Sequence, residues 1–160
     1  MATLMLAVVI WNGSRTVPAD PSQPIVLRGD APLAESTSDV LRVATFNIHS
    51  GRGRDRRFDL ARTAAVFPTP PDLLGLNEVR GTWHESLGRD QGGELGIKWG
   101  MQSAFVPTER RWWHDHFGNA VLTRVPIHQI HRLPLAGLRG KAFRTATLVQ
   151  FEFHGRPVQL

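Results

Sequence analysis

Two short polar clusters in the sequence carry side chains that could hold a divalent metal ion. Asn47 and His49 form the first cluster, and Asn77 and Glu78 form the second. Carboxylate and amide oxygens are hard donors that suit Mg²⁺ or Mn²⁺, which proteins commonly hold with one or two carboxylates, waters and a substrate phosphate. The alternative interpretation is structural: Asn47 caps a turn, and Glu78 pairs with a nearby arginine such as Arg80.

The elements predicted around these clusters would bring them to one edge of a sheet. Residues 41–48 and residues 73–79 are two β-rich runs, and each predicts a strand. Between them, residues 58–67 place apolar side chains near helical spacing before a proline-rich stop. A parallel β-α-β unit fits these three elements. Because open α/β sheets present ligand groups at strand ends, the two polar clusters could converge.

Further elements follow the β-α-β unit. We predict a short helix and then four strands, at residues 91–99, 101–106, 119–124, 127–133 and 143–153. The sequence His-Gly-Arg-Pro at residues 154–157 predicts a hairpin turn that leads into a return strand.

Three segments in this order resemble one known family. They are residues 41–49 (Leu-Arg-Val-Ala-Thr-Phe-Asn-Ile-His), 74–79 (Leu-Gly-Leu-Asn-Glu-Val) and 117–127 (Phe-Gly-Asn-Ala-Val-Leu-Thr-Arg-Val-Pro-Ile). They look like the opening strand with its metal-site Asn, the strand that ends in a metal-binding Glu, and a later Gly-Asn-Ala segment of the endonuclease/exonuclease/phosphatase superfamily, the deoxyribonuclease-I-like phosphodiesterases. The resemblance covers residues 41–160. It implies a two-layer α/β sandwich of the deoxyribonuclease-I-like type, truncated after its first half.

The resemblance also implies roles for individual residues in metal-dependent hydrolysis of phosphate esters, with Mg²⁺ or Mn²⁺ as cofactor. Glu78 becomes the principal metal ligand, and Asn47 becomes its partner. Asn119 either touches the phosphate or fixes its loop. His49 is either a second polar group of the site or an exposed loop residue, and Arg144 either neutralises a phosphate or is solvated. The family often has Gln where this chain has the residue before Glu78, a conservative departure.

The family's later motifs do not occur in these 160 residues. The resemblance assigns water activation and leaving-group chemistry to a Thr-His pair, a Gly-Asp-Phe-Asn segment and a Ser-Asp-His segment. Such groups contribute much of the barrier reduction in hydrolytic sites, so we expect negligible turnover by this chain alone. The alternative, from another functional class, is a catalytically incomplete module that binds phosphate or nucleic acid. An apolar face of residues 143–153 left without its second sheet would favour self-association.

A basic and aromatic segment forms a rival constellation. It contains two arginines, two tryptophans and two histidines: Arg110, Arg111, Trp112, Trp113, His114 and His116. The histidines would share a face of an extended chain and could bind Zn²⁺. Alternatively, an arginine grips phosphate while a tryptophan stacks on a base or a lipid headgroup. The third interpretation is a packed tryptophan beside a solvated loop.

Charge and composition narrow the choice of partners only in part. The formal net charge is +5 and all but two of the 19 Lys and Arg are arginine, which favours phosphate-bearing partners. Nucleic acid, phospholipid headgroups and small phosphoesters all suit this charge. A second basic group, Arg52, Arg54, Arg56 and Arg57, is either a solvated loop or a surface that faces an anionic substrate. The absence of cysteine removes disulfides, thiolate zinc sites and a cysteine nucleophile.

The first 40 residues differ in composition from the rest of the chain and predict a segment outside the domain. Residues 1–11 are apolar but too short to span a membrane, so they are a clipped anchor or signal, a core element or disordered. Residues 12–40 are rich in proline and predict a linker, in which residues 24–28 could form a short strand, and residues 41–160 form the domain. A clipped anchor would tether the protein to a membrane or mark it for export; otherwise we expect a cytoplasmic protein.

Overall fold

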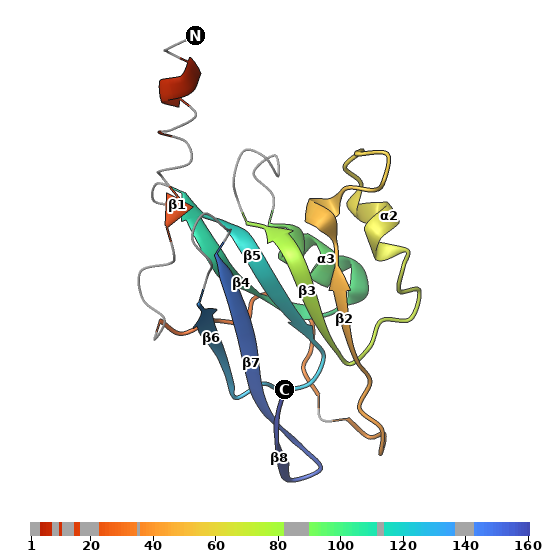
Figure 1. Cartoon of the computed structure of the whole chain (residues 1–160). Coiled ribbons are helices and arrows are strands. Elements are labelled where there is room, and N and C mark those ends of the chain that lie inside the picture. Colours follow the sequence, from red (N-terminus) through yellow and green to blue (C-terminus); the bar gives the residue numbers. More distant parts are fainter. Residues whose placement is uncertain are drawn as a thin grey trace.

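A computed structural model of the chain describes residues 4–7, 10, 15–16, 23–34, 36–81, 90–111, 114–136 and 143–160. In these residues a five-stranded sheet, of order β1-β4-β5-β3-β2, packs against a three-stranded sheet, of order β6-β7-β8 (Figure 1). The elements are β1 (Arg15–Thr16), β2 (Val43–Asn47), η1 (His49–Gly51), α2 (Leu60–Ala64), β3 (Leu73–Arg80), α3 (Gln91–Trp99), β4 (Gln102–Arg111), β5 (His114–Thr123), β6 (Gln129–Leu135), β7 (Arg144–Phe153) and β8 (Arg156–Gln159). The mixed α/β architecture confirms the predicted fold class.

The predicted β-α-β unit forms, with a shorter helix than the sequence suggested. Strands β2 and β3 are parallel, and Val43 pairs with Leu73 at the start of the ladder. Helix α2 covers only Leu60–Ala64 because the Asp59 side chain caps it, accepting a hydrogen bond from the Arg62 backbone N–H at 2.9 Å. Phe58 is therefore outside the helix.

Helix α3 has the bounds that the sequence predicts. Asp90 caps its first turn through Gly92 and Gly93, and Gly100 ends it in the left-handed conformation, with φ of 62°. Leu95 and Trp99 are buried against the large sheet. The helices thus cover one face of this sheet, which has its own apolar core.

The small sheet packs on the opposite face of the large sheet. Val149 and Phe151 of β7 are buried there, at 3% and 2% exposure, with Ile130 of β6. The predicted hairpin turn is shorter than expected: only His154 and Gly155 form it, both with positive φ, as a two-residue hairpin loop requires. A cavity of about 450 Å³, with Val43, Leu76 and Ala146 in its lining, remains between the sheets. The predicted self-association stays a prediction.

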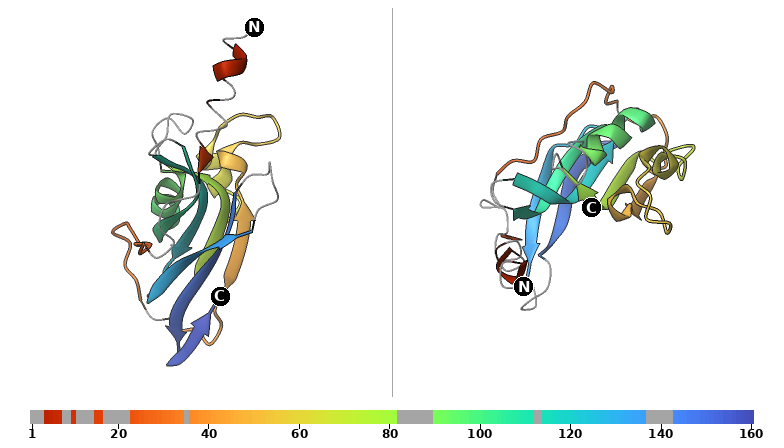
Figure 2. Two further views of the ribbon diagram at one scale, coloured as in Figure 1. Left: turned by 60° about the vertical axis from the view of Figure 1, so that its left-hand side comes forward. Right: turned by 90° about the horizontal axis from the view of Figure 1, so that it is seen from above.

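Part of the predicted linker lies against the domain. Arg28 and Ser103 exchange two backbone hydrogen bonds, of 2.7 and 2.9 Å, and Ile25 and Leu27 pack against the core between the sheets. Figure 2 shows residues 23–34 in orange as a stretch without helix that runs beside the large sheet. Of the apolar N-terminal segment, residues 4–7 form an exposed helical turn and residue 10 is exposed. No helix among the described residues has the length and apolarity to cross a membrane.

Candidate active site

A β-bulge in β3 sets the direction of the Glu78 side chain. Leu76 pairs with Ala120 and Val79 pairs with Gly118, so β3 has one residue more than β5 between these rungs. Glu78 is the residue with a left-handed backbone there, with φ of 57°. Leu76 and Val79 are both fully buried, whereas Glu78 is only half-buried. In a regular strand Glu78 would share the face of Leu76 and enter the core beneath the helices, so the bulge is what redirects the carboxylate.

Asn47 lies beside Glu78 because of the parallel ladder. Asn47 pairs in register with Asn77, the residue before Glu78. The Asn47 side-chain oxygen accepts a hydrogen bond from the His49 backbone N–H at 2.8 Å, so Asn47 does cap the turn at η1. An amide oxygen has two lone pairs, so this bond leaves acceptor capacity for a cation or a water.

One cavity collects four of the predicted site residues. It measures about 430 Å³, and its lining includes Asn47, Glu78, Asn119 and Arg144. The cavity spans both sheets, and Thr145 of β7 also lines it. The Asn119 amide nitrogen donates to the Thr145 carbonyl oxygen over 3.4 Å, a long hydrogen bond that orients the amide across the gap. Arg144 is exposed at this cavity.

A second cavity lies on another side of Glu78. It measures about 310 Å³ and is lined by His49, Ser50, Arg52, Glu78, Arg80 and Phe117. Glu78 and Phe117 therefore line both cavities. The structure thus places His49 beside Glu78 but in a different cavity from Asn119 and Arg144.

The Glu78 carboxylate makes no hydrogen bond or ion pair within the described residues, so the alternative pairing with Arg80 is not found there. Arg80 instead donates from Nε to the Ser50 hydroxyl at 3.1 Å. Its guanidinium carbon lies 4.9 Å from the centre of the Phe117 ring, a cation–π contact. The carboxylate is thereby left to face the two cavities.

The donor set fits Mg²⁺ or Mn²⁺ better than Zn²⁺. Glu78 offers a half-buried carboxylate, and Asn47 offers an amide oxygen beside it. No group of three or more His, Cys, Asp or Glu suited to a metal ion occurs in the part of the chain that the structure describes. An ion at Glu78 would complete its shell with waters and substrate phosphate, as Mg²⁺ does in many sites.

The described side chains of the rival constellation, those of Arg110, Arg111 and His116, line neither Glu78 cavity. Arg110 is held by Asp115, with 2.9 Å between Nε and the carboxylate, and this hydrogen bond raises the pKa of Arg110. Arg111 Nε is 3.6 Å from Glu109, and His116 Nε2 is 3.3 Å from the same carboxylate in the interior. Neither Arg110 nor Arg111 lines a cavity that contains Glu78, so the structure does not bring these predicted phosphate-binding residues to the site.

The two tryptophans of the rival constellation, Trp112 and Trp113, and the side chain of its histidine His114 lie outside the described residues. The prediction that a tryptophan stacks on a base or headgroup therefore stays a prediction.

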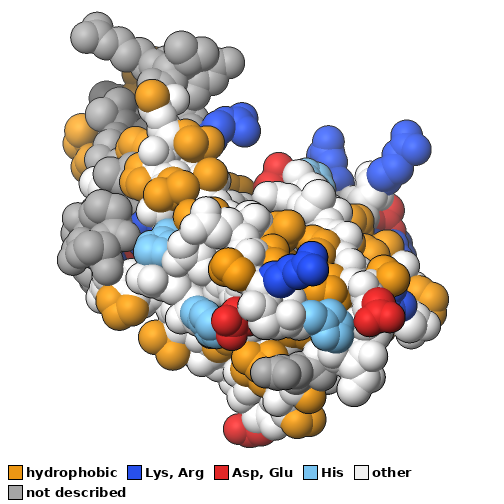
Figure 3. Space-filling view, turned by 90° about the horizontal axis from the view of Figure 1, so that it is seen from below, with side chains coloured by type: hydrophobic (Ala, Val, Ile, Leu, Met, Phe, Trp, Pro, Cys, Tyr) orange, Lys and Arg blue, Asp and Glu red, His pale blue; other side chains and the backbone are white. Residues whose placement is uncertain are grey.

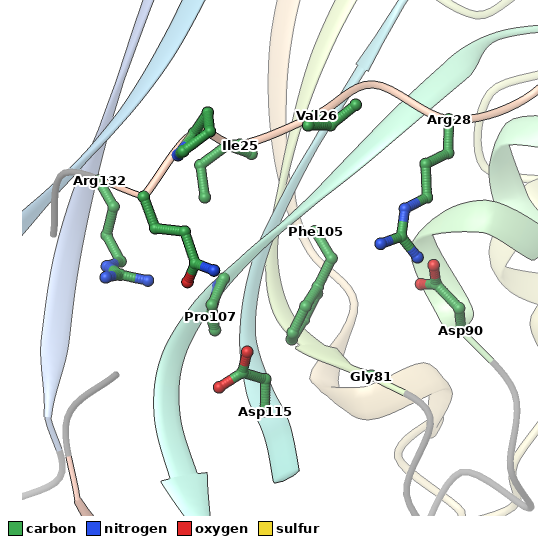
Figure 4. Close-up of a pocket in the computed structure, with 11 residues that line it drawn as sticks. Ile25, Val26, Arg28, Gly81, Asp90, Phe105, Pro107, Asp115 and Arg132 are labelled. Carbon is green, nitrogen blue, oxygen red and sulfur yellow. The ribbon is translucent and has the colours of Figure 1, made fainter. Parts of the chain in front are cut away.

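A further cavity that the sequence did not indicate lies beside residues 23–28. It measures about 380 Å³ and shares no lining residue with the two Glu78 cavities. In Figure 4 Arg28 and Asp90 point toward one another on one side of Phe105. These residues come from three separate segments, so sequence spacing gave no signal for this cavity.

A comparison with known protein families matches most of the chain to one family. Residues 44–159 match the Endonuclease/Exonuclease/phosphatase family, so the chain belongs to that family. This confirms the predicted superfamily and is consistent with its deoxyribonuclease-I-like α/β fold. The family is one of hydrolytic nucleases and phosphatases that act on phosphoesters. No match was found among the curated proteins or among the solved structures.

Proposed function

We propose that this chain carries the metal-binding part of a Mg²⁺- or Mn²⁺-dependent phosphoester hydrolase. The observation that supports the proposal is the bulge at Glu78, which directs the Glu78 carboxylate toward a cavity that Asn47 and Asn119 also line. This carboxylate has no hydrogen-bond or ion-pair partner among the described residues. A bulge beside a polar cavity commonly serves to aim a side chain. In this proposal Glu78 is the principal ligand and Asn47 its partner.

The remaining groups of the cavity would bind and orient the phosphate. The bound metal would supply Lewis-acid polarisation of a phosphoryl oxygen. Arg144, exposed at the cavity, would balance the charge of the phosphate, and the Asn119 amide would contact one of its oxygens while Thr145 holds the amide. The structure supports a binding and orienting role for these residues.

Turnover needs groups that activate water and protonate the leaving group. The Thr-His, Gly-Asp-Phe-Asn and Ser-Asp-His motifs that the family resemblance assigns to these steps are missing from the 160 residues. We therefore propose that this chain alone binds metal and phosphate but hydrolyses phosphoesters negligibly. A catalytically incomplete phosphate-binding module is the second candidate, and the same absence of motifs favours it.

Metal binding is tested by thermal unfolding with and without Mn²⁺. At ten times its dissociation constant a ligand stabilises the folded state by about 1.4 kcal/mol, and the melting temperature of a domain this size rises by roughly 3 to 6 °C. We expect this rise in the unmodified chain and its loss in Glu78→Gln. The matched control is Glu152→Gln, because Glu152 is exposed on β7 and lines neither Glu78 cavity.

The Mn²⁺ response of Glu78→Gln tests the metal assignment, and a hydrolysis assay tests whether the chain is an enzyme. An equal Mn²⁺ response in Glu78→Gln and in the unmodified chain would refute the metal assignment. A parallel assay with bis(p-nitrophenyl) phosphate and Mg²⁺ separates the two candidate functions. Hydrolysis that depends on Glu78 would identify an active enzyme, and metal binding without hydrolysis would identify the incomplete module.

A further inference from the structure

The outer edge of strand β2 has no neighbour among the described strands. β2 is the last strand of the large sheet and lies at its outer side, beyond β3 (Figure 1). The Arg42 carbonyl oxygen and the Ile48 N–H both bond to the β3 side, over 3.2 and 3.1 Å. Because backbone groups alternate in direction along a strand, those of the odd-numbered residues between them point away from β3. These residues are Val43, Thr45 and Asn47, and their backbone groups make no hydrogen bond at this edge with any described residue.

The other edges of the two described sheets are better protected against further pairing. β4 is covered in part by β1 and by a bridge between Arg28 and Ser103. β6 and β8 each contain a proline, Pro134 and Pro157, which has no backbone N–H to donate. β2 has the sequence Val-Ala-Thr-Phe-Asn, without a proline or a charged residue. Natural proteins commonly block sheet edges with such residues, so the edge of β2 is the one suited to a further strand.

Both faces of β2 would gain cover from an added strand. On one face Ala44 and Phe46 pack against the core beneath the helices, and both remain half-buried. On the other face Val43, which is 41% exposed, and Thr45 line the cavity of about 450 Å³ between the sheets. A strand beside β2 would therefore extend the core on the first face and cover the mouth of the cavity on the second.

The edge of β2 is complementary to itself. An antiparallel pairing centred on Thr45 sets Thr45 opposite Thr45 of a second copy and Val43 opposite Asn47. Every outward-pointing backbone group of the two strands then has a partner. The opposed side chains are small, uncharged and largely β-branched, which favours cross-strand packing.

Charge opposes this pairing only weakly. The nearest charged residue is Arg42, which lies beyond the paired segment, so the two copies of it fall at opposite ends of the ladder. Each is also 3.7 Å from the carboxylate of Asp72. The formal net charge of a copy is +5. In Figure 3, which views the molecule from the end at which β2 begins, the charged side chains are scattered singly and do not form a dense cluster.

From this edge we infer that the chain forms a symmetric dimer in which β2 pairs antiparallel with β2 of a second copy. The two large sheets then become one continuous sheet, with the two-fold axis at Thr45. The inference goes beyond the proposed function. It places self-association at β2 and not at the face of β7 that the sequence indicated, because Val149 and Phe151 of that face are buried. The two Asn47 residues would lie on the same face of the sheet, roughly 14 Å apart along the strands.

Sedimentation equilibrium over a concentration series tests the dimer. A ladder of five residues buries less area than a standard interface, so we expect a weak dimer with a dissociation constant in the micromolar range. Thr45→Lys and Thr45→Glu each place two like charges opposite one another, so each should weaken dimerisation roughly fivefold. An equimolar mixture of the two variants sets lysine opposite glutamate and should restore the dimer. Added salt should weaken the mixed dimer and strengthen each dimer of like charges.

The matched control is Gln159→Lys, because Gln159 is exposed on β8, at an edge of the small sheet. It should leave the dissociation constant unchanged within about twofold, as expected for a surface charge outside an interface. The Thr45 hydroxyl accepts a hydrogen bond from the Asn77 amide at 3.0 Å, so the melting temperatures of the Thr45 variants are measured alongside. Thr45→Ser keeps this hydroxyl and should dimerise like the unmodified chain. Val43→Pro, at the first residue of the strand, removes an outward N–H and should weaken the dimer independently of Thr45.

Three results would overturn the inference. The first is an unmodified chain that stays monomeric throughout the concentration series. The second is a dimer that Thr45→Lys and Thr45→Glu leave unchanged, or that Gln159→Lys weakens as much as they do. The third is loss of the dimer in both charged variants without recovery in their mixture, which would exclude the register centred on Thr45. The metal assignment is separate, because Thr45 lines neither Glu78 cavity and the Mn²⁺ response should persist in Thr45→Lys.

Discussion

Asn47 and Asn77 are register partners at the last pair of the parallel ladder between β2 and β3. The Ile48 backbone N–H extends this ladder by donating to the Asn77 carbonyl oxygen at 3.1 Å. Backbone hydrogen bonds therefore fix the separation between Asn47 and the residue that precedes Glu78. Because a ladder is more rigid than a loop, the proposed metal ligands are positioned by the fold before any ligand binds.

The left-handed backbone of Glu78 should be measurable as strain. With φ of 57°, this position disfavours residues with a bulky or branched Cβ and tolerates Asn. We expect Glu78→Val to unfold about 1 to 2 kcal/mol more easily than Glu78→Asn, with urea denaturation as the measurement. Equal stabilities of the two variants would mean that the bulge does not impose this conformation.

The sequence predicted the meeting of Asn47 and Glu78 because parallel strands joined by a helix end at the same edge. It did not reveal the bulge, since Leu-Gly-Leu-Asn-Glu-Val reads as a regular strand and an inserted residue changes only the pairing with β5. The sequence indicated Arg110 as a candidate phosphate-binding residue. Its pairing with Asp115 across the β4–β5 hairpin, which spacing does not disclose, holds it elsewhere.

The docking of residues 23–34 also escaped sequence analysis. Prolines and the lack of a period predicted a linker, but Ile25 and Leu27 pack against the core between the sheets and Arg28 pairs with Ser103 through two backbone hydrogen bonds. Two isolated apolar residues give no periodic signal, so only the tertiary structure could show that part of the predicted linker belongs to the domain.

A hydrogen bond between the two sheets should contribute to the stability of the site. The hydroxyls of Thr108 and Thr145 lie 2.8 Å apart, and Thr108 is 5% exposed. Thr145→Val leaves the Thr108 hydroxyl without this partner, so we expect a loss of about 1 to 2 kcal/mol in the free energy of unfolding. The double variant Thr108→Val with Thr145→Val should recover part of that loss. Strictly additive losses would show that the two hydroxyls are not coupled.

Gly118 of the Gly-Asn-Ala segment should tolerate no side chain. A Cβ at Gly118 would contact the Val106 carbonyl oxygen and would approach the Pro107 Cα and the Thr108 backbone nitrogen to 2.9 Å each. These are backbone atoms of β4 and cannot turn aside, so Gly118→Ala should cost more than about 2 kcal/mol. The control Gly100→Ala meets nothing within 4 Å and has φ of 62°, so it should cost only about 1 kcal/mol. Similar stabilities for the two variants would contradict this account of the close approach.

The ion pair between Asp55 and Arg62 predicts an acid-dependent loss of stability in the basic loop. Hydrogen bonds from the Arg62 side chain and the Arg57 backbone lower the pKa of Asp55 from 3.8 to about 2. A lowered pKa in the folded state means that the pair stabilises the fold above about pH 4 and that this contribution disappears as the pH falls toward 2. The difference in melting temperature between the unmodified chain and Asp55→Asn should therefore shrink over this range. Both side chains are exposed, so added salt should also reduce it. Arg62→Gln should reduce the same pH-dependent difference without abolishing it, because the Arg57 backbone N–H still donates to Asp55. A difference that stays constant from pH 5 to about pH 2 would show that Asp55 acts through the backbone of the loop and not through its charge.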